Sequence, residues 1–345
     1  MKKKGWLLML ASVMVLTLVL SGCGAKNKET DPATGGSAPK SDLKVGLVTD
    51  LGSVNDKSFN QSAWEGLQKL RDEKGVSVKY MEPKKDAEII PNLNQFVKGG
   101  YDLTWATGFT MMDPVKQIAG ENPNAKLAII DAEVQAPNVA SVLFQEHEGS
   151  FLVGVIAGLT TKTNKLGFVG GLELPVIKRF EVGFRAGVEA VNPEAAKNLK
   201  VIYTADFSRV DKGKSAASTI YEGGADIIFH ASGMTGNGVF NEAKERKQRG
   251  ENVWVIGVDM DQSLTFGDEI TLTSMIKRVD NAVIEISKQL EGDKFPAGKT
   301  TYMGLKEKGV DIAPTSTKNV APEVLEKVEE YRTKIINGEI KVPSE

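Results

Sequence analysis

The amino-acid sequence predicts an α/β protein in which two doubly wound lobes each contain a parallel sheet. From residue 43 onward, short apolar segments alternate with longer segments of helical character, which is typical of strands joined by crossover helices. The short segments are continuously apolar, as expected for strands that are covered on both faces. About ten strands are expected, and that number fits two sheets better than a single one.

The first 22 residues are predicted to be a lipoprotein signal peptide. Residues 2–4 are lysines, and residues 5–20 carry no charge. A spanning helix needs about 20 apolar residues, so this segment is short for a permanent span and suits a signal peptide. It ends in Leu-Ser-Gly-Cys, which resembles the lipobox of bacterial lipoproteins and makes Cys23 the expected lipidated residue. The alternative is a short anchor helix that is retained, with an incidental cysteine.

Residues 23–42 are predicted to be the lipidated cysteine and a flexible tether. The stretch after Cys23 is polar, is rich in Gly, Ala, Pro, Ser, Thr and Lys, and has no apolar period. Such a chain has a root-mean-square reach of about 25 Å. We therefore expect the body of the protein to be lipid-anchored at the extracytoplasmic face of the cell membrane.

Composition excludes several classes of function. The 345 residues include 43 Lys and Arg against 45 Asp and Glu, a net charge of −2, so nucleic acid is not an expected partner. A single cysteine excludes an internal disulfide and any CxxC metal or redox motif. The two histidines, His147 and His230, lack the short spacing of zinc-binding helices. We expect no metal, no cofactor and no cysteine-based catalysis.

The expected elements of the body follow one another in regular order. The expected strands cover residues 43–49, 76–81, 103–106, 126–130, 139–143, 166–169, 201–203, 227–230, 253–258 and 272–276. The expected helices lie between them and cover residues 60–74, 88–98, 112–122, 149–161, 177–192, 212–223, 238–249 and 278–290. Each strand is a short apolar run, and each helix is long enough to return the chain for a parallel neighbour.

Many of the expected strands end in a polar residue or in glycine. The clearest cases are Asp50, Asp131, Gly170-Gly171, Ser232-Gly233 and Asp259. In open α/β sheets, ligands bind beyond the carboxyl ends of the strands, so these residues are candidates for a site. The alternative for each is a structural role, because Asp, Ser and Asn also cap helices and form turns.

Two glycine-rich segments are similar to nucleotide-binding loops only in part. Residues 292–300 have one residue too many between the glycines for a phosphate loop and follow a helix, so we expect a helix-to-strand turn. Residues 233–238 contain three glycines, but not in the order of a dinucleotide-binding loop. Ser53, Ser58 and Ser232 lack a partnering histidine and a nucleophile elbow. Serine hydrolase chemistry therefore has no support.

A set of motifs spread over nearly the whole body is more specific. Residues 49–60, Thr-Asp-Leu-Gly-Ser-Val-Asn-Asp-Lys-Ser-Phe-Asn, follow the first expected strand and open a helix. Further matching stretches are residues 130–131, 148–158, 166–171, 180–187, 203–207, 230–236, 256–262 and 273–278. Together these motifs resemble the basic membrane protein family of bacterial lipoproteins, which are similar to the purine-nucleoside receptor of bacterial transporters.

The resemblance implies a type I periplasmic-binding-protein fold, with two lobes joined by three crossovers and a ligand cleft between them. It implies an N-terminal lobe of residues 43–146 and 267–293, and a C-terminal lobe of residues 147–266 and 294–345. It also implies a monomer that binds a nucleoside, most simply a purine nucleoside, and delivers it to the permease of an ABC importer without catalysis.

The resemblance further implies which residues contact the base. Phe59 and Phe207 would stack on its two faces, with Phe180 as the alternative for the second face. Asp50 would accept N–H groups from the edge of the base, with Asn60 assisting. Residue 51, which can be polar in the family, is a leucine here, so one base contact and the purine selectivity are left open.

The remaining implied contacts are to the ribose. Asp131 and Asp259 would accept from its hydroxyl groups, and Lys277 would donate to a ribose oxygen and neutralise these carboxylates. Gly233 would let the backbone approach the sugar. Three acids and one lysine favour a neutral polyol over an anionic nucleotide. The alternatives are core positions for the phenylalanines, helix caps for the acids and a tight turn for Gly233.

Three other functions remain open at this stage. A sugar could replace the nucleoside, although a monosaccharide does not need two facing aromatic rings. The protein could bind its ligand as a sensor or surface antigen without transport. A nucleoside-cleaving enzyme is disfavoured, because the multi-Asp N-terminal signature expected for calcium-dependent nucleoside hydrolysis is absent from the sequence.

Overall fold

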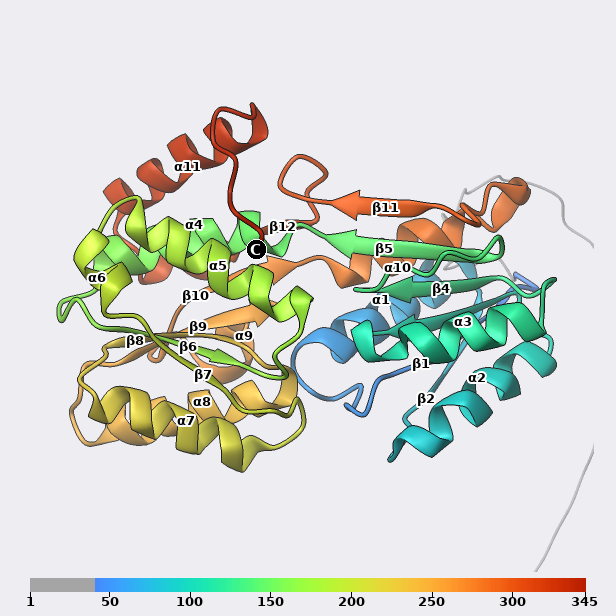
Figure 1. Ribbon diagram of the computed structural model, residues 1–345, viewed down its shortest axis with the longest axis horizontal. Coiled ribbons are helices and arrows are strands. Elements are labelled where there is room, and N and C mark those ends of the chain that lie inside the picture. Colours follow the sequence, from blue (N-terminus) through green and yellow to red (C-terminus); the bar gives the residue numbers. More distant parts are fainter. Residues whose placement is uncertain (1–40) are drawn as a thin grey trace, which may run out of the picture. The chain divides into compact units, whose positions relative to one another are not determined.

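The computed structural model describes residues 41–345, apart from the side chain of Asp293. The expected signal peptide, Cys23 and nearly all of the expected tether lie outside the described residues. Residues 41–345 form two six-stranded sheets with helices on both faces of each (Figure 1). The prediction of two α/β lobes is therefore confirmed. None of the helices in this range is both long and apolar enough to cross a membrane.

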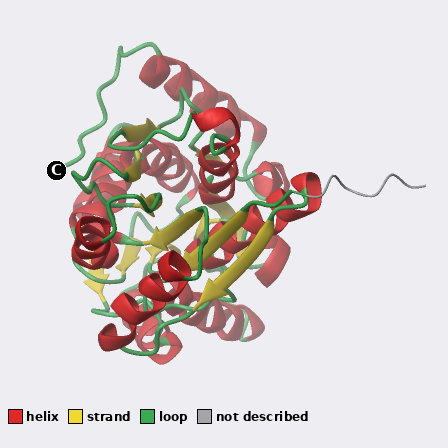
Figure 2. Ribbon diagram, turned by 90° about the vertical axis from the view of Figure 1, so that its right-hand side faces the viewer, coloured by secondary structure: helices red, strands yellow, loops and turns green. Residues whose placement is uncertain are grey.

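The sheet of the first lobe has the strand order β11-β5-β4-β3-β1-β2, and its neighbours are all parallel. Its strands are β1 (Lys44–Val48), β2 (Ser77–Met81), β3 (Leu103–Thr107), β4 (Leu127–Ile130), β5 (Val139–Phe144) and β11 (Thr300–Met303). One face packs on α1 (Phe59–Lys74) and α10 (Val279–Lys288), and the other on α2 (Ile89–Lys98) and α3 (Met112–Glu121). Figure 2 shows strands of this lobe side by side, with helices on both sides.

The sheet of the second lobe has the strand order β12-β10-β9-β8-β6-β7. Its strands are β6 (Leu166–Gly170), β7 (Lys200–Tyr203), β8 (Ile227–Ala231), β9 (Trp254–Asp259), β10 (Thr271–Lys277) and β12 (Val310–Ile312). Only the β12–β10 pair is antiparallel. Its helices are α4 (Glu146–Thr160), α5 (Pro175–Glu189), α6 (Pro193–Lys197), α7 (Val210–Glu222), α8 (Gly236–Gln248), α9 (Ser263–Phe266) and α11 (Pro322–Ile336).

The chain passes between the two sheets three times, after β5, after β10 and after β11. The expected lobe boundaries differ from this topology near the C-terminus. The strand within residues 267–293, β10, belongs to the second sheet, whereas β11, within residues 294–345, belongs to the first. An apolar pattern identifies a strand such as β10 but not the sheet in which it pairs, so the lobe boundaries implied by the resemblance could not be checked from the sequence.

All ten expected strands and all eight expected helices are present, with ends shifted by a few residues. The sequence did not predict β11, β12, α11 or the short helices α6 and α9. Residues 292–300 do connect a helix to a strand, because they lie between the turn that follows α10 and the start of β11. The expected helix-to-strand turn is therefore confirmed.

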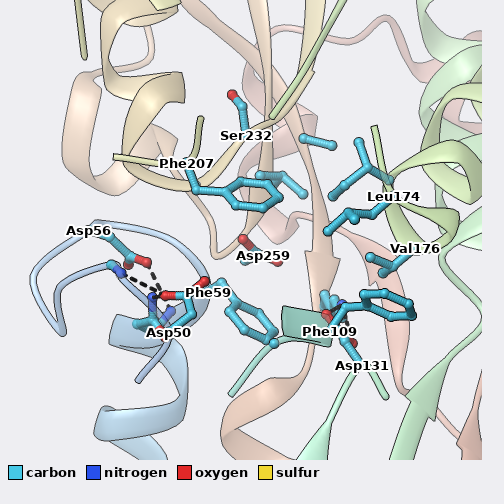
Figure 3. A pocket seen from close by; sticks show the side chains of 18 of the residues that line it. Asp50, Asp56, Phe59, Phe109, Asp131, Leu174, Val176, Phe207, Ser232 and Asp259 are labelled. Atoms are coloured by element: carbon cyan, nitrogen blue, oxygen red, sulfur yellow. Dashed lines mark hydrogen bonds and ion pairs between the residues drawn. The ribbon is translucent and has the colours of Figure 1, made fainter. Parts of the chain in front are cut away.

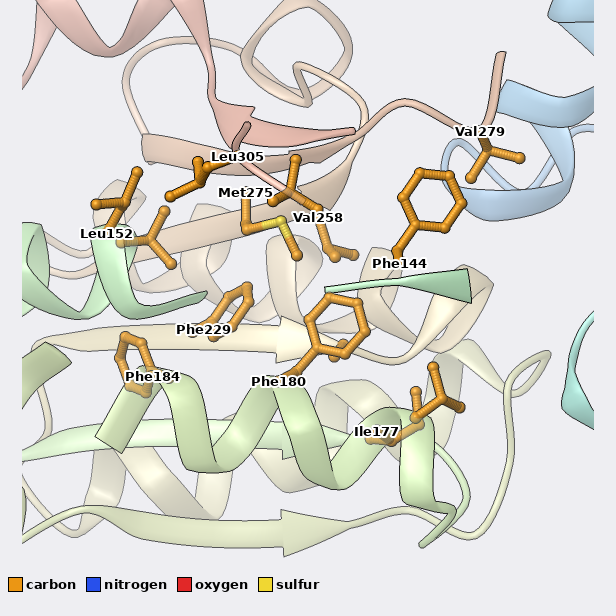
Figure 4. Close-up of a cluster of buried hydrophobic side chains, with 14 of the residues drawn as sticks. Phe144, Leu152, Ile177, Phe180, Phe184, Phe229, Val258, Met275, Val279 and Leu305 are labelled. Carbon is orange, nitrogen blue, oxygen red and sulfur yellow. The ribbon is translucent and has the colours of Figure 1, made fainter. Parts of the chain in front are cut away.

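The largest apolar core contains residues of both lobes and lies directly beneath the ends of the strands. Phe144, Phe180, Phe184 and Phe229 are among its buried aromatic residues, and Met275 of β10 lies between them (Figure 4). Interiors of this kind are close-packed and resist local displacement. The core therefore fixes the carboxyl ends of β5, β8 and β10, where the polar residues of the site begin.

Candidate functional site

A cavity lies between the two lobes at the carboxyl ends of both sheets (Figure 3). It lies where the strand order reverses, at β1 and β3 in one sheet and at β6 and β8 in the other, as expected for doubly wound sheets. All eight ligand residues expected from the sequence line it: Asp50, Phe59, Asn60, Asp131, Phe207, Gly233, Asp259 and Lys277.

Two phenylalanines from different lobes face each other across this cavity. Phe59 is the first residue of α1, and Phe207 lies in the loop after β7 (Figure 3). Both side chains are half-buried, whereas Phe180, which also lines the cavity, is only 3% exposed and packs in the core. A Cβ atom at Gly171 would collide with the Phe207 ring, so glycine at this position makes room for that ring. The two half-buried rings can hold a flat ligand between them.

One end of the cavity is formed by Asp50 and Asn60. Oδ1 of Asp50 accepts from the Gly52 backbone N–H at 2.8 Å and from Nδ2 of Asn60 at 2.9 Å. Thr107 Oγ1 donates to Oδ1 of Asn60 at 2.7 Å, which fixes the orientation of the amide. Among the described residues, Oδ2 of Asp50 has no hydrogen-bond donor. It is therefore available to a ligand, and burial raises the pKa of this carboxyl.

Asp56 is a site residue that the sequence analysis missed. Its carboxylate accepts from the backbone N–H groups of Ser58, Asn60 and Gln61 at 2.8–3.1 Å, so Asp56 caps helix α1. Burial raises its pKa to about 7. An aspartate shortly before a helix is a recognised capping signal, so local sequence could have identified it. Asn60 does not cap α1, because its side chain bonds Asp50 and Thr107 instead.

The opposite end of the cavity contains a buried chain of alternating charges. Lys277 Nζ lies 2.6 and 2.7 Å from the oxygens of Asp131 and 3.1 Å from Glu146. Glu146 in turn accepts from Nε of Arg179 at 2.7 Å. Burial raises the pKa of Asp131, while Lys277 opposes that shift. Burial opposes the charged form of Lys277, but Asp131 and Glu146 outweigh it and raise its pKa.

Glu146 and Arg179 were not predicted as site residues. Glu146 is the first residue of α4 and Arg179 lies on α5, so no local sequence signal joins them. Their role follows from tertiary structure. Glu146 is the second carboxylate beside the Lys277 ammonium, and the Arg179 guanidinium in turn pairs with Glu146. Buried charges need such partners to remain ionised. Lys277 is therefore neutralised mainly by protein groups before any ligand binds.

Asp131 and Asp259 share an uncommon backbone conformation. Their φ angles are +69° and +65°, in the left-handed region that residues other than glycine rarely adopt. Such conformations concentrate at functional sites, where surrounding contacts hold them. Asp131 bonds Lys277, and Asp259 accepts a hydrogen bond from Ser58 Oγ of the other lobe. Gly233 also has a positive φ, +55°, which glycine adopts without strain.

The charge of the cavity favours a neutral ligand. Four aspartates and one lysine line it, and an apolar wall completes it with Phe109, Leu174, Val176, Ile177 and Val258. An anion would meet uncompensated negative charge, whereas a ligand with several O–H or N–H donors would satisfy the carboxylates. No cluster of three or more metal-binding side chains occurs among residues 41–345.

Residues 43–345 match the family model of the PnrA-like ABC transporter substrate-binding proteins. The chain belongs to this family. This match confirms the resemblance inferred from the sequence motifs. It also confirms the expectation that the chain is a substrate-binding protein of an ABC transporter.

Three proteins of known sequence or structure are similar to this chain. The "CD4+ T-cell-stimulating antigen" of Listeria innocua is 44% identical to this chain, over 99% of both chains. The "ABC transporter nucleoside-binding protein BmpA" of Lactococcus lactis is 36% identical, again over 99% of both. The crystal structure of an ABC transporter solute-binding protein from Aeropyrum pernix has a TM-score of 0.80 and 30% identity, covering 88% of this chain and 94% of that one.

Proposed function

We propose that this chain is the nucleoside-binding component of an ABC importer and that a purine nucleoside occupies the cavity. The observation that carries the proposal is the facing pair of Phe59 and Phe207 (Figure 3). Aromatic rings on both faces of a base supply stacking that tolerates different bases. The Lactococcus relative, which carries a nucleoside-binding name, supports the same ligand class.

The polar residues fit the two ends of a nucleoside. Oδ2 of Asp50 would accept from the base, and Asp131 and Asp259 would accept from ribose hydroxyl groups. Lys277 would donate to a ribose oxygen while Asp131 and Glu146 balance its charge. Gly233, which lines the cavity, would bring its backbone close to the sugar. The four aspartates would disfavour a nucleotide, whose phosphate adds negative charge.

The test is a ligand screen on the purified full-length protein. Thermal shift against nucleosides, free bases, nucleotides and monosaccharides should show stabilisation by purine nucleosides at one site per chain, and calorimetry should confirm the stoichiometry. Because a ligand that binds only the folded protein raises its apparent stability, the shift should grow with ligand concentration. Stabilisation by a monosaccharide, with nucleosides inactive, would replace this proposal by a sugar-binding function.

We also propose that binding involves no chemistry. The protein should return its nucleoside unchanged after prolonged incubation, as measured by chromatography. Release of free base and ribose well above background, abolished by Asp131→Asn, would instead identify a nucleoside-cleaving enzyme.

The proposed location is the extracytoplasmic face of the cell membrane, where the chain would meet its permease. Anchoring would use a lipid on Cys23, which lies outside the described residues. Cys23→Ser should abolish incorporation of labelled palmitate and leave ligand binding by the body intact. Labelling of the Cys23→Ser protein to the same extent as the wild type would contradict lipid attachment at this cysteine.

A further inference from the structure

A hydrogen bond away from the cavity joins the two lobes. Nε2 of Gln262, which follows β9 in the second lobe, donates to the backbone carbonyl of Lys57 in the first lobe at 2.8 Å. The two residues are 205 positions apart in the sequence. Gln262 is 0% exposed, yet it is not among the residues that line the cavity. A ligand in the cavity therefore need not touch Gln262 for this bond to form.

The interior of the second lobe fixes the direction in which the Gln262 amide points. The backbone N–H of Val258 donates to Oε1 of Gln262 at 2.9 Å, so the oxygen must lie on that side. His230 Nε2 lies 2.9 Å from the same oxygen and therefore carries its proton there. Ser274 Oγ accepts from the backbone N–H of Gln262 at 3.1 Å. With Oε1 engaged, Nε2 is left pointing at Lys57.

The acceptor belongs to a loop that is held on both sides. Asp56 ties this loop to the first turn of α1 through three backbone N–H groups. Toward the second lobe, Ser58 Oγ donates to Asp259 and Nδ2 of Asn237 lies 3.4 Å from the Asp56 carbonyl. Phe59 comes directly after this loop and lines the cavity. Contacts of the loop with the second lobe therefore determine where the Phe59 ring lies.

We propose that Gln262 is a positioning residue for ligand capture. Val258 and His230 fix the orientation of its side-chain amide. When the lobes close, this amide donates a hydrogen bond to the Lys57 carbonyl, and the Asn237 amide donates to the neighbouring carbonyl of Asp56. The bond forms only in the closed arrangement, so it shifts the open–closed equilibrium and with it the affinity for any ligand that needs closure. The identity of the ligand rests on the proposed function, but the action of Gln262 on closure does not.

Gln262→Glu tests this inference with almost no change of shape. At a pH at which the new carboxyl is ionised, one oxygen still accepts from Val258 and His230, but the second now faces the Lys57 carbonyl, which is also an acceptor. The substitution therefore penalises closure while keeping the contacts inside the second lobe. A neutral hydrogen bond contributes about 2- to 10-fold to an equilibrium constant, and a repulsive replacement should cost about 10-fold or more.

Spin labels at Lys116→Cys on α3 and Lys244→Cys on α8 would report the distance between the lobes. Both positions are exposed, and a Cys23→Ser background removes the only native cysteine. Without ligand, Gln262→Glu should shift the distance distribution toward longer, open values. Its affinity for adenosine, guanosine and inosine should fall about 10-fold or more, and saturating nucleoside should restore the closed distance. Gln95→Glu, exposed on α2, is the matched control and should behave as the wild type.

Wild-type distances together with wild-type affinity in Gln262→Glu would overturn the inference. If the wild-type protein binds none of these nucleosides, the proposed function fails, and the unliganded distances alone decide the role of Gln262. If Gln262→Glu does not unfold cooperatively, Asn237→Ala on the half-buried start of α8 takes its place. That variant should shift the same distribution toward open values, by a smaller amount, and an unchanged distribution would overturn the inference.

Discussion

Lys277 and Asp131 end strands of different sheets, and yet the lysine ammonium lies 2.6 and 2.7 Å from the two carboxylate oxygens. Lys277 is 1% exposed, and its charge is shared with Glu146, which is 0% exposed. The pair therefore joins the lobes from within the ligand cavity. Its position ties the two sheets together at the wall of the cavity.

Removal of the Lys277 ammonium should destabilise the protein strongly. Lys277→Met leaves Asp131 and Glu146 buried without their common partner, and loss of one member of a buried pair costs about 3–5 kcal/mol. Urea unfolding of the unliganded protein measures the loss. Lys116→Met, at an exposed position on α3, is the control and should change stability by no more than about 0.5 kcal/mol. Equal effects of the two substitutions would show that the buried pairing is dispensable.

Phe207→Ala should weaken ligand binding far more than it weakens the fold. Loss of one stacking face costs about 1–3 kcal/mol, or roughly 5- to 150-fold in nucleoside affinity. Phe180→Ala provides the comparison, because a buried core phenylalanine should cost about 3–5 kcal/mol of stability. Calorimetry and urea unfolding separate the two effects. A stability loss for Phe207→Ala as large as that for Phe180→Ala would place Phe207 in the core and remove it from the site.

Asp259→Asn should lower nucleoside affinity by about one to two orders of magnitude. The substitution keeps the shape but exchanges a charged acceptor, whose hydrogen bonds contribute about 1.5–3 kcal/mol, for a neutral amide. On the wild type, 2′-deoxy and 3′-deoxy nucleosides should lose a similar amount of affinity. In the mutant, at least one of these two penalties should shrink. Two full, additive penalties would mean that Asp259 serves only to hold Ser58 and does not reach the sugar.

Acidic pH should lower the stability of the folded protein, because His230 is held in its neutral form. Burial lowers its pKa from the ordinary 6.5 to about 4, although the Gln262 hydrogen bond opposes that shift. Between these two values the unfolded chain binds a proton that the folded chain does not, so unfolding becomes easier as pH falls from about 6.5 to 4. One such proton changes the free energy of unfolding by about 1.4 kcal/mol per pH unit.

Urea unfolding from pH 4 to 7 measures this slope. In His230→Gln the slope of the unfolding free energy against pH should be smaller, by the equivalent of up to one bound proton. This holds whatever the absolute stability of the variant. His147→Gln is the control for the second histidine, whose pKa burial also lowers. An identical slope in the wild type and His230→Gln would show that His230 does not remain neutral in the folded protein.

Much of the fold could be predicted because parallel strands in this protein are nearly continuous apolar runs. Strands such as β3 and β8, buried at every position, leave no doubt about their class. β11 and β12 were missed because they are short, half-buried edge strands that contain threonine, tyrosine and aspartate. Their pairing with β5 and β10 is a tertiary property that no local pattern encodes.

The same division applies to the site. Asp50, Asp131 and Asp259 could be predicted because each lies at or just after the carboxyl end of a strand, and these ends meet at one edge of a parallel sheet. Glu146 and Gln262 could not, because each acts through a partner far away in the sequence. Sequence indicates which residues come to the edge of a sheet, whereas the pairing of charges and amides behind them depends on how the two lobes pack.

The three passages of the chain between the sheets determine how the protein tolerates truncation. No single cut separates one lobe from the other, because β11 returns to the first sheet after β10 has been added to the second. A chain ending at residue 298 would lose β11 and β12 together and expose β5 and β10 as new, apolar edges, which are templates for aggregation. Synthesis must therefore reach the last 40 or so residues before the edge strand of either sheet is in place, so a fragment lacking them would aggregate rather than keep half of the activity.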